Sequence, residues 1–205
     1  LPVHNWRDLA FPTVDKVSAQ AVRDTIRVGM DACHACPVAC KKVVETAEID
    51  RVYGGPEMET LGALGPNCDI DDLEAIAKGS ALCNAYSLDT ISTGSTISFA
   101  MECFENGIIT EADMDGTPLR WGQAEAMISM LEKMIAREGF GDILADGVKI
   151  AAEKLGGGAE KFAMHVGGQE PGLHNALFLP SRGTGFVCDP TPGRHTAAPM
   201  ARIDG

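Results

Sequence analysis

Residues 71–86 read DDLEAIAKGSALCNAY. Apolar and small side chains recur at Leu73, Ile76, Ala77 and Ser80, which is the three- and four-residue spacing of one helix face. The acidic residues at the start of the stretch suit the positive end of a helix dipole. The stretch therefore predicts an α-helix that buries one face, and its neighbours follow the same pattern.

The flanking segments repeat this spacing over most of the chain, so the predicted fold class is mostly α with a few short strands. The apolar faces between residues 71 and 155 should bury one another and form an ordered core. We expect a helical domain over residues 1–156. The irregular start of a following domain, rich in Gly and Pro, should occupy residues 157–205. The pattern predicts helices at 18–30, 57–64, 71–86, 90–106, 122–138 and 142–155, a hairpin at 43–53 and a strand at 162–166.

The composition is that of a globular protein: 205 residues, 45% apolar and 22% charged, with a net charge of −12. An acidic surface argues against binding to the phosphate backbone of nucleic acids. No stretch of about 18 apolar residues is present, so no membrane span is expected. The first residues lack an initiator Met and the basic and apolar regions of a signal peptide. The chain therefore reads as the middle of a longer protein.

Three of the seven cysteines lie close together, at Cys33, Cys36 and Cys40. The spacing C-x2-C-x3-C lets three thiolates from one tight loop bind one compact centre, and iron–sulfur clusters often add a distant fourth ligand. Zinc usually takes a second cysteine pair, which this chain lacks, and three buried free thiols are the remaining alternative. The odd cysteine count argues against a disulfide framework and indicates a reducing compartment, which we take to be the cytoplasm.

Two of the other four cysteines lie in expected loops and two lie in expected helices. Cys68 and Cys188 lie in expected loops, so either could supply a fourth ligand. Cys83 and Cys103 fall within helical patterns and are expected in the core.

Several segments together resemble one known family, in the right order and with similar spacing, over roughly residues 1–170. They are Cys33–Cys40, Gly55-Pro-Glu-Met-Glu-Thr60, Leu82–Gly94 with Phe99–Cys103, Gly141–Val148 with Ala151–Gly156, and Met164-His-Val-Gly167. The second segment is close to the family's G-P-E-Y-E-T and the last to its H-V-K-G. The family is the tungsten-dependent aldehyde:ferredoxin oxidoreductases. The resemblance implies that this chain covers the helical second domain and the start of the third, without the β-rich N-terminal domain.

The resemblance implies two cofactors. The three clustered cysteines match those that bind a [4Fe–4S] cluster in the family. A bis-pterin tungsten (or molybdenum) centre is contacted in the family partly through a D-x-x-G-L-D motif, which here reads Asn84-Ala-Tyr-Ser-Leu-Asp89. Leu88 and Asp89 match the motif. Asn84 departs from it, but its amide can still hydrogen-bond pterin nitrogens. From the residues alone, Asp89 is also a good N-cap for the helix that follows.

The resemblance also implies two catalytic residues. Glu59 matches a glutamate near the metal that accepts a proton, and burial beside an anionic cofactor is expected to raise its pKa. His165 matches a histidine near the substrate carbonyl, where it would polarise the oxygen or carry a proton. From the residues alone, Glu59 would instead stabilise a helix N-terminus and His165 would be a hydrogen-bonded structural residue. Gly167 replaces the family's lysine, which weakens the case for a simple aldehyde substrate.

The implied activity is oxidation of aldehydes to carboxylic acids, with the cluster passing electrons to ferredoxin. A homodimer is implied in the same way. One alternative on the same scaffold is low-potential reduction of an aromatic acyl thioester, as in benzoyl-CoA reductase-type enzymes. An alternative of another class is a stand-alone helical module that binds an iron–sulfur cluster or zinc. Because the pterin site would be incomplete, these 205 residues alone are expected to be inactive.

Overall fold

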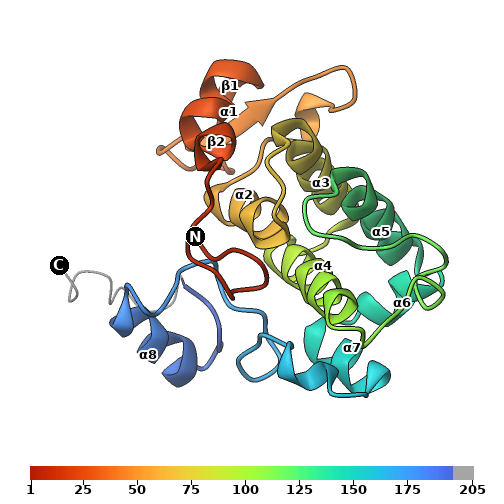
Figure 1. The fold of residues 1–205 in the computed structure, drawn as a ribbon. Coiled ribbons are helices and arrows are strands. Elements are labelled where there is room, and N and C mark those ends of the chain that lie inside the picture. The colour runs from red at the N-terminus through yellow and green to blue at the C-terminus, as the bar shows by residue number, and fades with distance from the viewer. Residues whose placement is uncertain (196–205) are drawn as a thin grey trace.

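The computed structural model describes residues 1–195 and consists mainly of helices around one large core (Figure 1). The end of the expected second domain, residues 196–205, lies outside the described residues. The mostly α class is confirmed, since the described part contains a single sheet of two strands. No helix in this part is both long enough and apolar enough to cross a membrane. The helices are α1 (Ala19–Thr25), α2 (Met58–Leu64), α3 (Leu73–Tyr86), α4 (Thr90–Glu105), α5 (Ala124–Ala136), α6 (Phe140–Leu144), α7 (Val148–Leu155) and α8 (Pro180–Cys188).

Helix α4 lies at the centre of the helical body and contacts α2, α3, α5 and α7 (Figure 1). Every residue from 93 to 103 is buried, because neighbours cover the helix on all sides. The closest approach is to α2: a Cβ added at Gly94 would lie 2.5 Å from the backbone of Ala63. Near the N-termini of these two helices, the hydroxyls of Thr60 and Thr90 lie 2.9 Å apart. This packing fixes the start of α2 beside the start of α4.

The first predicted helix is shorter than expected. Helix α1 ends at Thr25, and the chain continues as strand β1 (Arg27–Asp31), which pairs antiparallel with β2 (Lys41–Val44). Gly29, a poor helix former, breaks the apolar pattern that suggested a helix to residue 30. The hairpin predicted over 43–53 is also wrong, because its first two residues pair with β1 and Arg51–Tyr53 forms a 3-10 turn.

The helix predicted over 142–155 is two helices, α6 and α7, separated at Gly147 with φ +88°. The N–H of Val148 donates to Oε1 of Glu170 at 2.7 Å, and Glu170 is buried. A carboxylate at this position stabilises the positive end of α7. The contact also brings the segment that follows His165 against α7.

The C-terminal segment differs most from the prediction. The strand expected at 162–166 is absent from the described structure; Val166 instead pairs with Gln169 across a tight turn. Gly167 (φ +63°) and Gly168 (φ +96°) make this turn, because left-handed backbone favours glycine. Helix α8 was not predicted, because its glycines hide the helical pattern. Further 3-10 turns lie at Val14–Val17, Pro66–Cys68 and Ala159–Lys161.

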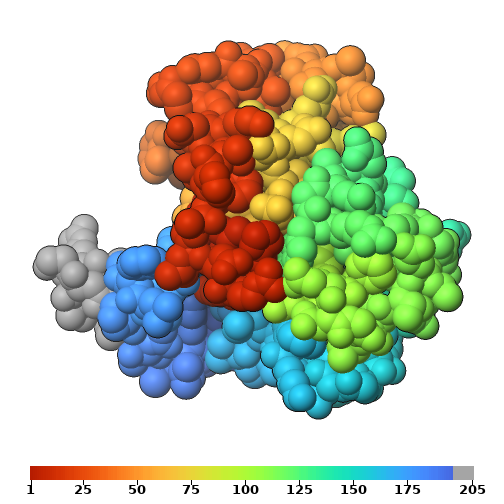
Figure 2. Space-filling model, viewed as in Figure 1, coloured from red at the N-terminus to blue at the C-terminus, as the bar shows by residue number. Residues whose placement is uncertain are grey.

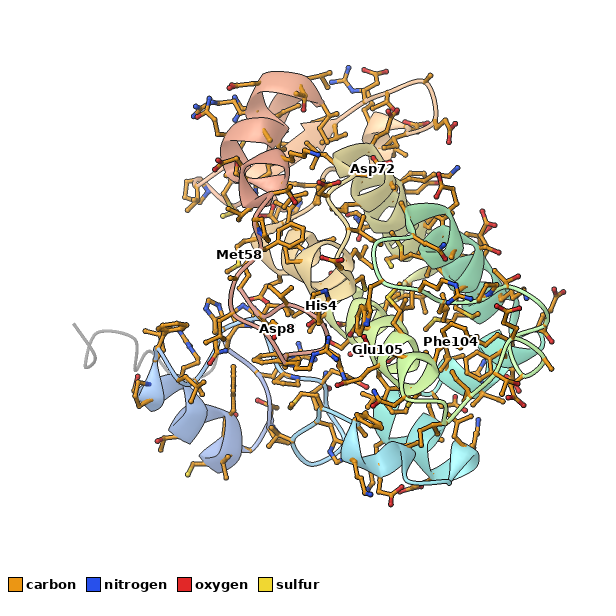
Figure 3. The ribbon with its side chains drawn as sticks, viewed as in Figure 1. His4, Asp8, Met58, Asp72, Phe104 and Glu105 are labelled. Atoms are coloured by element: carbon orange, nitrogen blue, oxygen red, sulfur yellow. The ribbon has the colours of Figure 1, made fainter. Side chains whose placement is uncertain are left out.

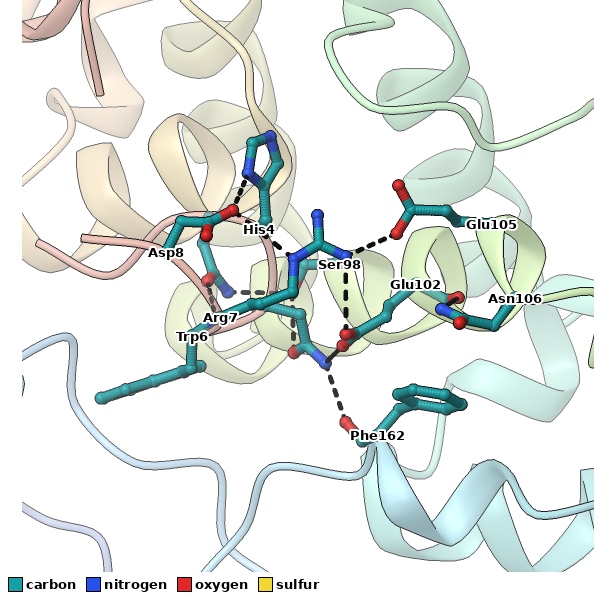
Figure 4. Close-up of polar contacts among 11 residues, drawn as sticks. His4, Trp6, Arg7, Asp8, Ser98, Glu102, Glu105, Asn106 and Phe162 are labelled. Atoms are coloured by element: carbon teal, nitrogen blue, oxygen red, sulfur yellow. Dashed lines mark hydrogen bonds and ion pairs between the residues drawn. The ribbon is translucent and has the colours of Figure 1, made fainter. Parts of the chain in front are cut away.

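The N-terminal segment is held against α4 by polar contacts (Figure 4). Nδ2 of Asn5 donates to Oε2 of Glu102 at 2.7 Å and to the carbonyl oxygen of Phe162 at 2.8 Å. Nη1 of Arg7 lies 2.6 Å from Oε2 of Glu105. The side chains of His4 and Glu105 lie on the same side of the molecule (Figure 3). In the space-filling view this segment covers part of the helical body (Figure 2). It thereby joins α4 to the segment that leads to His165.

Candidate functional site

The three clustered cysteines lie in the loop between β1 and β2, residues 32–40, which we call the thiol loop. Cys33 and Cys40 are exposed and Cys36 is half-buried. The N–H of Cys36 donates to the carbonyl of Cys33 at 2.9 Å, which closes a tight turn. Ala35 (φ +57°) and Ala39 (φ +49°) are left-handed, and each directly precedes a cysteine. Left-handed residues of this kind form nests of backbone N–H groups that favour anions, including iron–sulfur centres. The loop thus carries the three thiols on one short connection, and their role as cluster ligands stays a prediction.

Three other cysteines lie in the core, as the helical pattern predicted for Cys83 and Cys103. The Cys68 thiol contacts the carbonyl oxygens of Ala63 at 3.4 Å and Gly94 at 3.5 Å. Burial raises the pKa of Cys68 well above its usual value, that of Cys83 to about 11 and that of Cys103 to about 12. Cys68 is therefore a core residue, and the expectation that it could be a fourth ligand is wrong.

Glu59 lies in the first turn of α2 with its side chain 12% exposed. Its Oε2 accepts a hydrogen bond from the N–H of Leu173 at 2.6 Å. Its Oε1 lies 2.9 Å from Nε2 of His174 and 3.4 Å from Nε2 of His195. Neither ring is aligned to donate a hydrogen bond to Oε1, which is buried. Glu59 is thus held by the C-terminal segment, 114 residues further along the chain.

The pKa of the Glu59 carboxyl is not raised in the protein alone. Burial disfavours its charged form, but the His174 contact, the Leu173 N–H and the charge of His195 outweigh burial. The pKa of Glu59 therefore lies below its usual value in the protein alone, and the rise expected beside an anionic cofactor stays a prediction. Burial lowers the pKa of His195, which favours a neutral imidazole.

His165 does not lie against Glu59; within the described residues, His174 and His195 do. Nδ1 of His165 accepts a hydrogen bond from the N–H of Gly168 at 3.2 Å, across the glycine turn. The catalytic role of His165 stays a prediction. Sequence reasoning missed His174 and His195, since neither lies in a periodic segment. The one available signal was their position in the Gly- and Pro-rich segment just after the match to the family's H-V-K-G.

Leu88 and Asp89 line a polar cavity of about 350 Å³, together with Asp146 and residues 168–170. Oδ1 of Asp89 also accepts from the N–H of Ser92 at 2.8 Å, so it caps α4 as the residue pattern predicted. The lining supplies carboxylates, hydroxyls and an amide, which can bind the polar edges of a pterin ring. Asn84 is not among the lining residues; its Nδ2 donates to the carbonyl of Tyr53 at 2.8 Å.

A smaller cavity of about 50 Å³ adjoins the same residues. Asp89, Gln169 and Glu170 line both cavities, and His195 lines the smaller one. The smaller cavity therefore lies between Asp89 of the predicted pterin segment and His195. Because the hydroxyls of Thr60 and Thr90 lie 2.9 Å apart, the helix starts that carry Glu59 and Asp89 lie side by side.

The fold and the site define a helical domain with a polar cavity lined by Leu88, Asp89 and Asp146, and with a separate loop that carries three thiols. The whole chain, residues 1–205, matches the sequence profile "Aldehyde ferredoxin oxidoreductase, domains 2 & 3". The chain belongs to the aldehyde ferredoxin oxidoreductase family, a family of oxidoreductases, as the segment resemblance predicted.

Individual relatives support the same assignment. The tungsten-containing aldehyde ferredoxin oxidoreductase of Pyrococcus furiosus is 38% identical over 76% of this chain and 26% of its own length. The protein of the same name from Thermococcus kodakarensis is 33% identical over 95% of this chain and 32% of its own length. This chain therefore spans only about a quarter to a third of these relatives.

A solved structure shares the fold. It is the active-site complex BamBC of benzoyl coenzyme A reductase with 1,5-dienoyl-CoA, and it superimposes with a TM-score of 0.69. The match covers 84% of this chain and 26% of that chain, at 24% sequence identity. At this identity the similarity concerns the fold alone.

Proposed function

We propose that this chain is part of a cytoplasmic tungsten-pterin, [4Fe–4S] oxidoreductase that oxidises aldehydes to carboxylic acids with ferredoxin as electron acceptor. The observation that carries the proposal is the thiol loop, in which three accessible cysteines and two left-handed residues share one short connection between paired strands. The names of the relatives, which contain tungsten and ferredoxin, support the metal and the electron acceptor. Family membership also favours an enzyme over a stand-alone binding module.

Cys33, Cys36 and Cys40 would hold three corners of the cluster, and its fourth ligand would come from elsewhere in the protein. The cluster carries negative charge, and the N–H groups at Ala35 and Ala39 would stabilise it. Transfer of one electron at a time to ferredoxin requires the cluster to lie near the surface. The exposure of Cys33 and Cys40 among the described residues supports this.

Leu88 and Asp89 would contact a pterin through the 350 Å³ cavity, with Asn84 placed at the end of α3 beside them in sequence. When bound, the metal-pterin group would supply the two-electron redox chemistry. The side chains would orient the pterin through their hydrogen bonds and exclude water from it. Molybdenum in place of tungsten would use the same residues.

Glu59 would accept a proton. Oxidation of an aldehyde with one water yields a carboxylic acid, two protons and two electrons, so a base is needed near the reacting water. Glu59 is ionised at neutral pH, in the form that can accept a proton, and its lowered pKa makes it a weaker base than an unshifted glutamate. His165, within the same C-terminal segment, would polarise the substrate carbonyl. A homodimer remains a prediction from the family.

Iron and sulfide content tests this proposal. Full-length protein should be reconstituted anaerobically, and about four iron and four sulfide per chain are expected. Cys36→Ala should lose most of the iron, because one of three local ligands is gone. Val38→Ala, in the same loop and 70% exposed, is the matched control and should keep it. Absence of iron from the unsubstituted protein, or its retention in Cys36→Ala, would refute the proposal.

One observation favours a second candidate function, the reduction of an aromatic acyl thioester at low potential. A Cβ at Gly167 would lie 3.1 Å from Cγ of Pro192, and φ there is +63°. The family's lysine is therefore disfavoured at this position, so the site differs from that of simple aldehyde oxidases. Assays of the full-length enzyme with both substrate types separate the candidates. Aldehyde-dependent reduction of ferredoxin supports the first, and dearomatisation of the thioester with a strong reductant supports the second.

A further inference from the structure

The sheet of β1 and β2 is a basic region in an acidic protein. Residues 27–44 carry three basic side chains, Arg27, Lys41 and Lys42, and one acidic side chain, Asp31, whereas the whole chain has a net charge of −12. The three cations lie on the two strands that flank the thiol loop. The surface of this sheet is therefore less acidic than the rest of the molecule, and it attracts negatively charged partners more strongly.

Two of these cations have no ionic partner. Most Lys and Arg side chains among residues 1–195 form an ion pair with a carboxylate, as Lys42 does with Glu57. Arg27 and Lys41 form none within this part of the chain, and Nη1 of Arg27 reaches only Sδ of Met30, at 3.7 Å. Both charges are therefore available to carboxylates of another molecule.

Exposed apolar side chains lie among these cations. Val28 and Met30 in β1 are each about half exposed, and Val38 in the thiol loop and Val52 are more exposed still. Val52 belongs to the 3-10 turn Arg51–Tyr53, which contacts β2, and β2 pairs with β1, so these segments form one continuous region. Apolar side chains bordered by charged ones are the usual composition of a protein–protein interface.

We propose that this surface, made by Arg27, Lys41 and the exposed side chains of Val28, Met30 and Val38, docks a small acidic protein that carries electrons. The inference rests on the proposed function, in which that carrier is ferredoxin. The two unpaired cations would steer the carboxylates of the carrier, and the apolar side chains would hold it after contact. Docking at this surface brings the carrier directly against the thiol loop.

The size and charge of the surface favour this partner over a second copy of the chain. Electron-transfer complexes are transient and bury less area than permanent ones, so one small sheet with its loop is sufficient. In a symmetric dimer formed through this surface, the same patch would face itself, and Arg27 and Lys41 would meet like charges. An acidic carrier instead brings the opposite charge to both residues.

Direct binding tests the docking surface without turnover. The dissociation constant of full-length, iron-loaded enzyme for the ferredoxin of the same cell is measured by titration calorimetry at low and high salt. Arg27→Glu combined with Lys41→Glu should raise it about tenfold or more at low salt and weaken its salt dependence. Lys161→Glu is the matched control, because Lys161 is exposed, forms no ion pair within the described residues and follows α7, far from β1 and β2 (Figure 1). An unchanged constant in the double variant would overturn the proposal.

An apolar substitution tests the other half of the surface. Val28→Ser should raise the dissociation constant about fivefold or more and leave its salt dependence unchanged, because it removes apolar contact and no charge. Ile150→Ser, at an exposed apolar position of α7, is the control and should bind ferredoxin normally. Equal weakening by the two variants would overturn the assignment to this surface.

Iron content, sedimentation and aldehyde oxidation separate the remaining outcomes. If the double variant loses iron, changes its oligomeric state or loses stability while its ferredoxin affinity is unchanged, the cations serve the cluster, a second copy or the rest of the polypeptide, and the docking surface is refuted. If charge reversal prevents folding, Arg27→Gln and Lys41→Gln decide the question, each with an expected increase of about threefold.

The same measurements keep this inference apart from the proposed function. Protein that takes up no iron but binds ferredoxin through Arg27 and Lys41 refutes the proposed function alone. Protein that takes up iron and oxidises aldehydes, but binds ferredoxin equally well in the double variant, refutes the docking surface alone.

Discussion

Helix α4 and the thiol loop show two different ways in which this sequence specifies structure. The helix is buried on all sides, and its large side chains Phe99 and Met101 are completely enclosed. The thiol loop buries almost nothing, and its one large aliphatic side chain, Val38, is 70% exposed. Apolar burial therefore determines α4, whereas turn hydrogen bonds and left-handed residues determine the loop. Substitutions that affect stability should concentrate in the first region, and substitutions that affect cofactor content in the second.

The largest expected effect comes from truncating an enclosed side chain. Phe99→Ala should lower the free energy of unfolding by about 3–5 kcal/mol, because it loses buried apolar area and leaves a cavity. Val38→Ala should change it by less than about 0.5 kcal/mol, as expected for an exposed position. Urea denaturation followed by circular dichroism measures both. Similar losses in the two variants would mean that the loop is packed in solution.

A pair of glycines sharpens the comparison. Gly94→Ala places a methyl group 2.5 Å from the backbone of Ala63, so α2 and α4 must separate, at a cost of about 1–3 kcal/mol. Gly29→Ala, in strand β1 beside the thiol loop, meets nothing within 4 Å. It should stabilise the protein by about 0.5–1 kcal/mol, because alanine loses less backbone entropy on folding than glycine. In thermal unfolding, the melting temperature should fall for Gly94→Ala and rise for Gly29→Ala. An unchanged melting temperature in Gly94→Ala would contradict the close packing of α2 and α4.

Capping of α3 gives a smaller effect. Oδ1 of Asp72 accepts hydrogen bonds from the N–H groups of Glu74 at 3.0 Å and Ala75 at 3.1 Å. Asp72→Ala should cost about 1 kcal/mol, since two N–H groups lose their partner. Asp31→Ala, at the last residue of β1 before the thiol loop, removes one exposed hydrogen bond from the N–H of Ala32 and should cost much less. If urea denaturation gave equal losses of unfolding free energy for the two variants, the Asp72 cap would be no more stabilising than one exposed hydrogen bond.

The sequence predicted the helical body well and the rest poorly, for one physical reason. Helices α3, α4 and α5 follow the 3.6-residue pattern because each buries apolar side chains against its neighbours. Strand β1 and helix α8 bury few such side chains, so periodicity could not identify them. Gly147 splits the last predicted helix through a left-handed conformation that spacing alone does not reveal.

The candidate site was predictable where its residues are neighbours in sequence. The spacing of the thiols and the N-cap position of Asp89 could both be recognised from short segments. The group around Glu59 could not, since His174 and His195 reach it from more than 100 residues away. Long-range contacts of this kind depend on the packing of α2 against α4 and on the path of the C-terminal segment. No local pattern encodes them.

The smallest expected effect is on the pH dependence of stability, and it distinguishes the buried Glu102 from the exposed Glu105, both in α4. Burial raises the pKa of Glu102 above its usual 4.5, although the hydrogen bond from Asn5 opposes the shift. The folded state then binds a proton more tightly than the unfolded state, so stability falls as pH rises from 4.5 through the raised value. The exposed Glu105 behaves oppositely, because its hydrogen bond with Arg7 lowers its pKa, so its contribution is lost as pH falls below 4.5.

Two amide substitutions test this difference. Glu102→Gln should reduce the loss of stability above pH 4.5, and Glu105→Gln should reduce the loss below it. We expect the Glu102 effect to stay below about 1 kcal/mol, because Arg7 and solvent screen the charge. Urea denaturation between about pH 3 and pH 7 follows both variants. If Glu102→Gln left the profile above pH 4.5 unchanged, the contact between Asn5 and α4 would be open to water, and the N-terminal segment would not seal the core at this point.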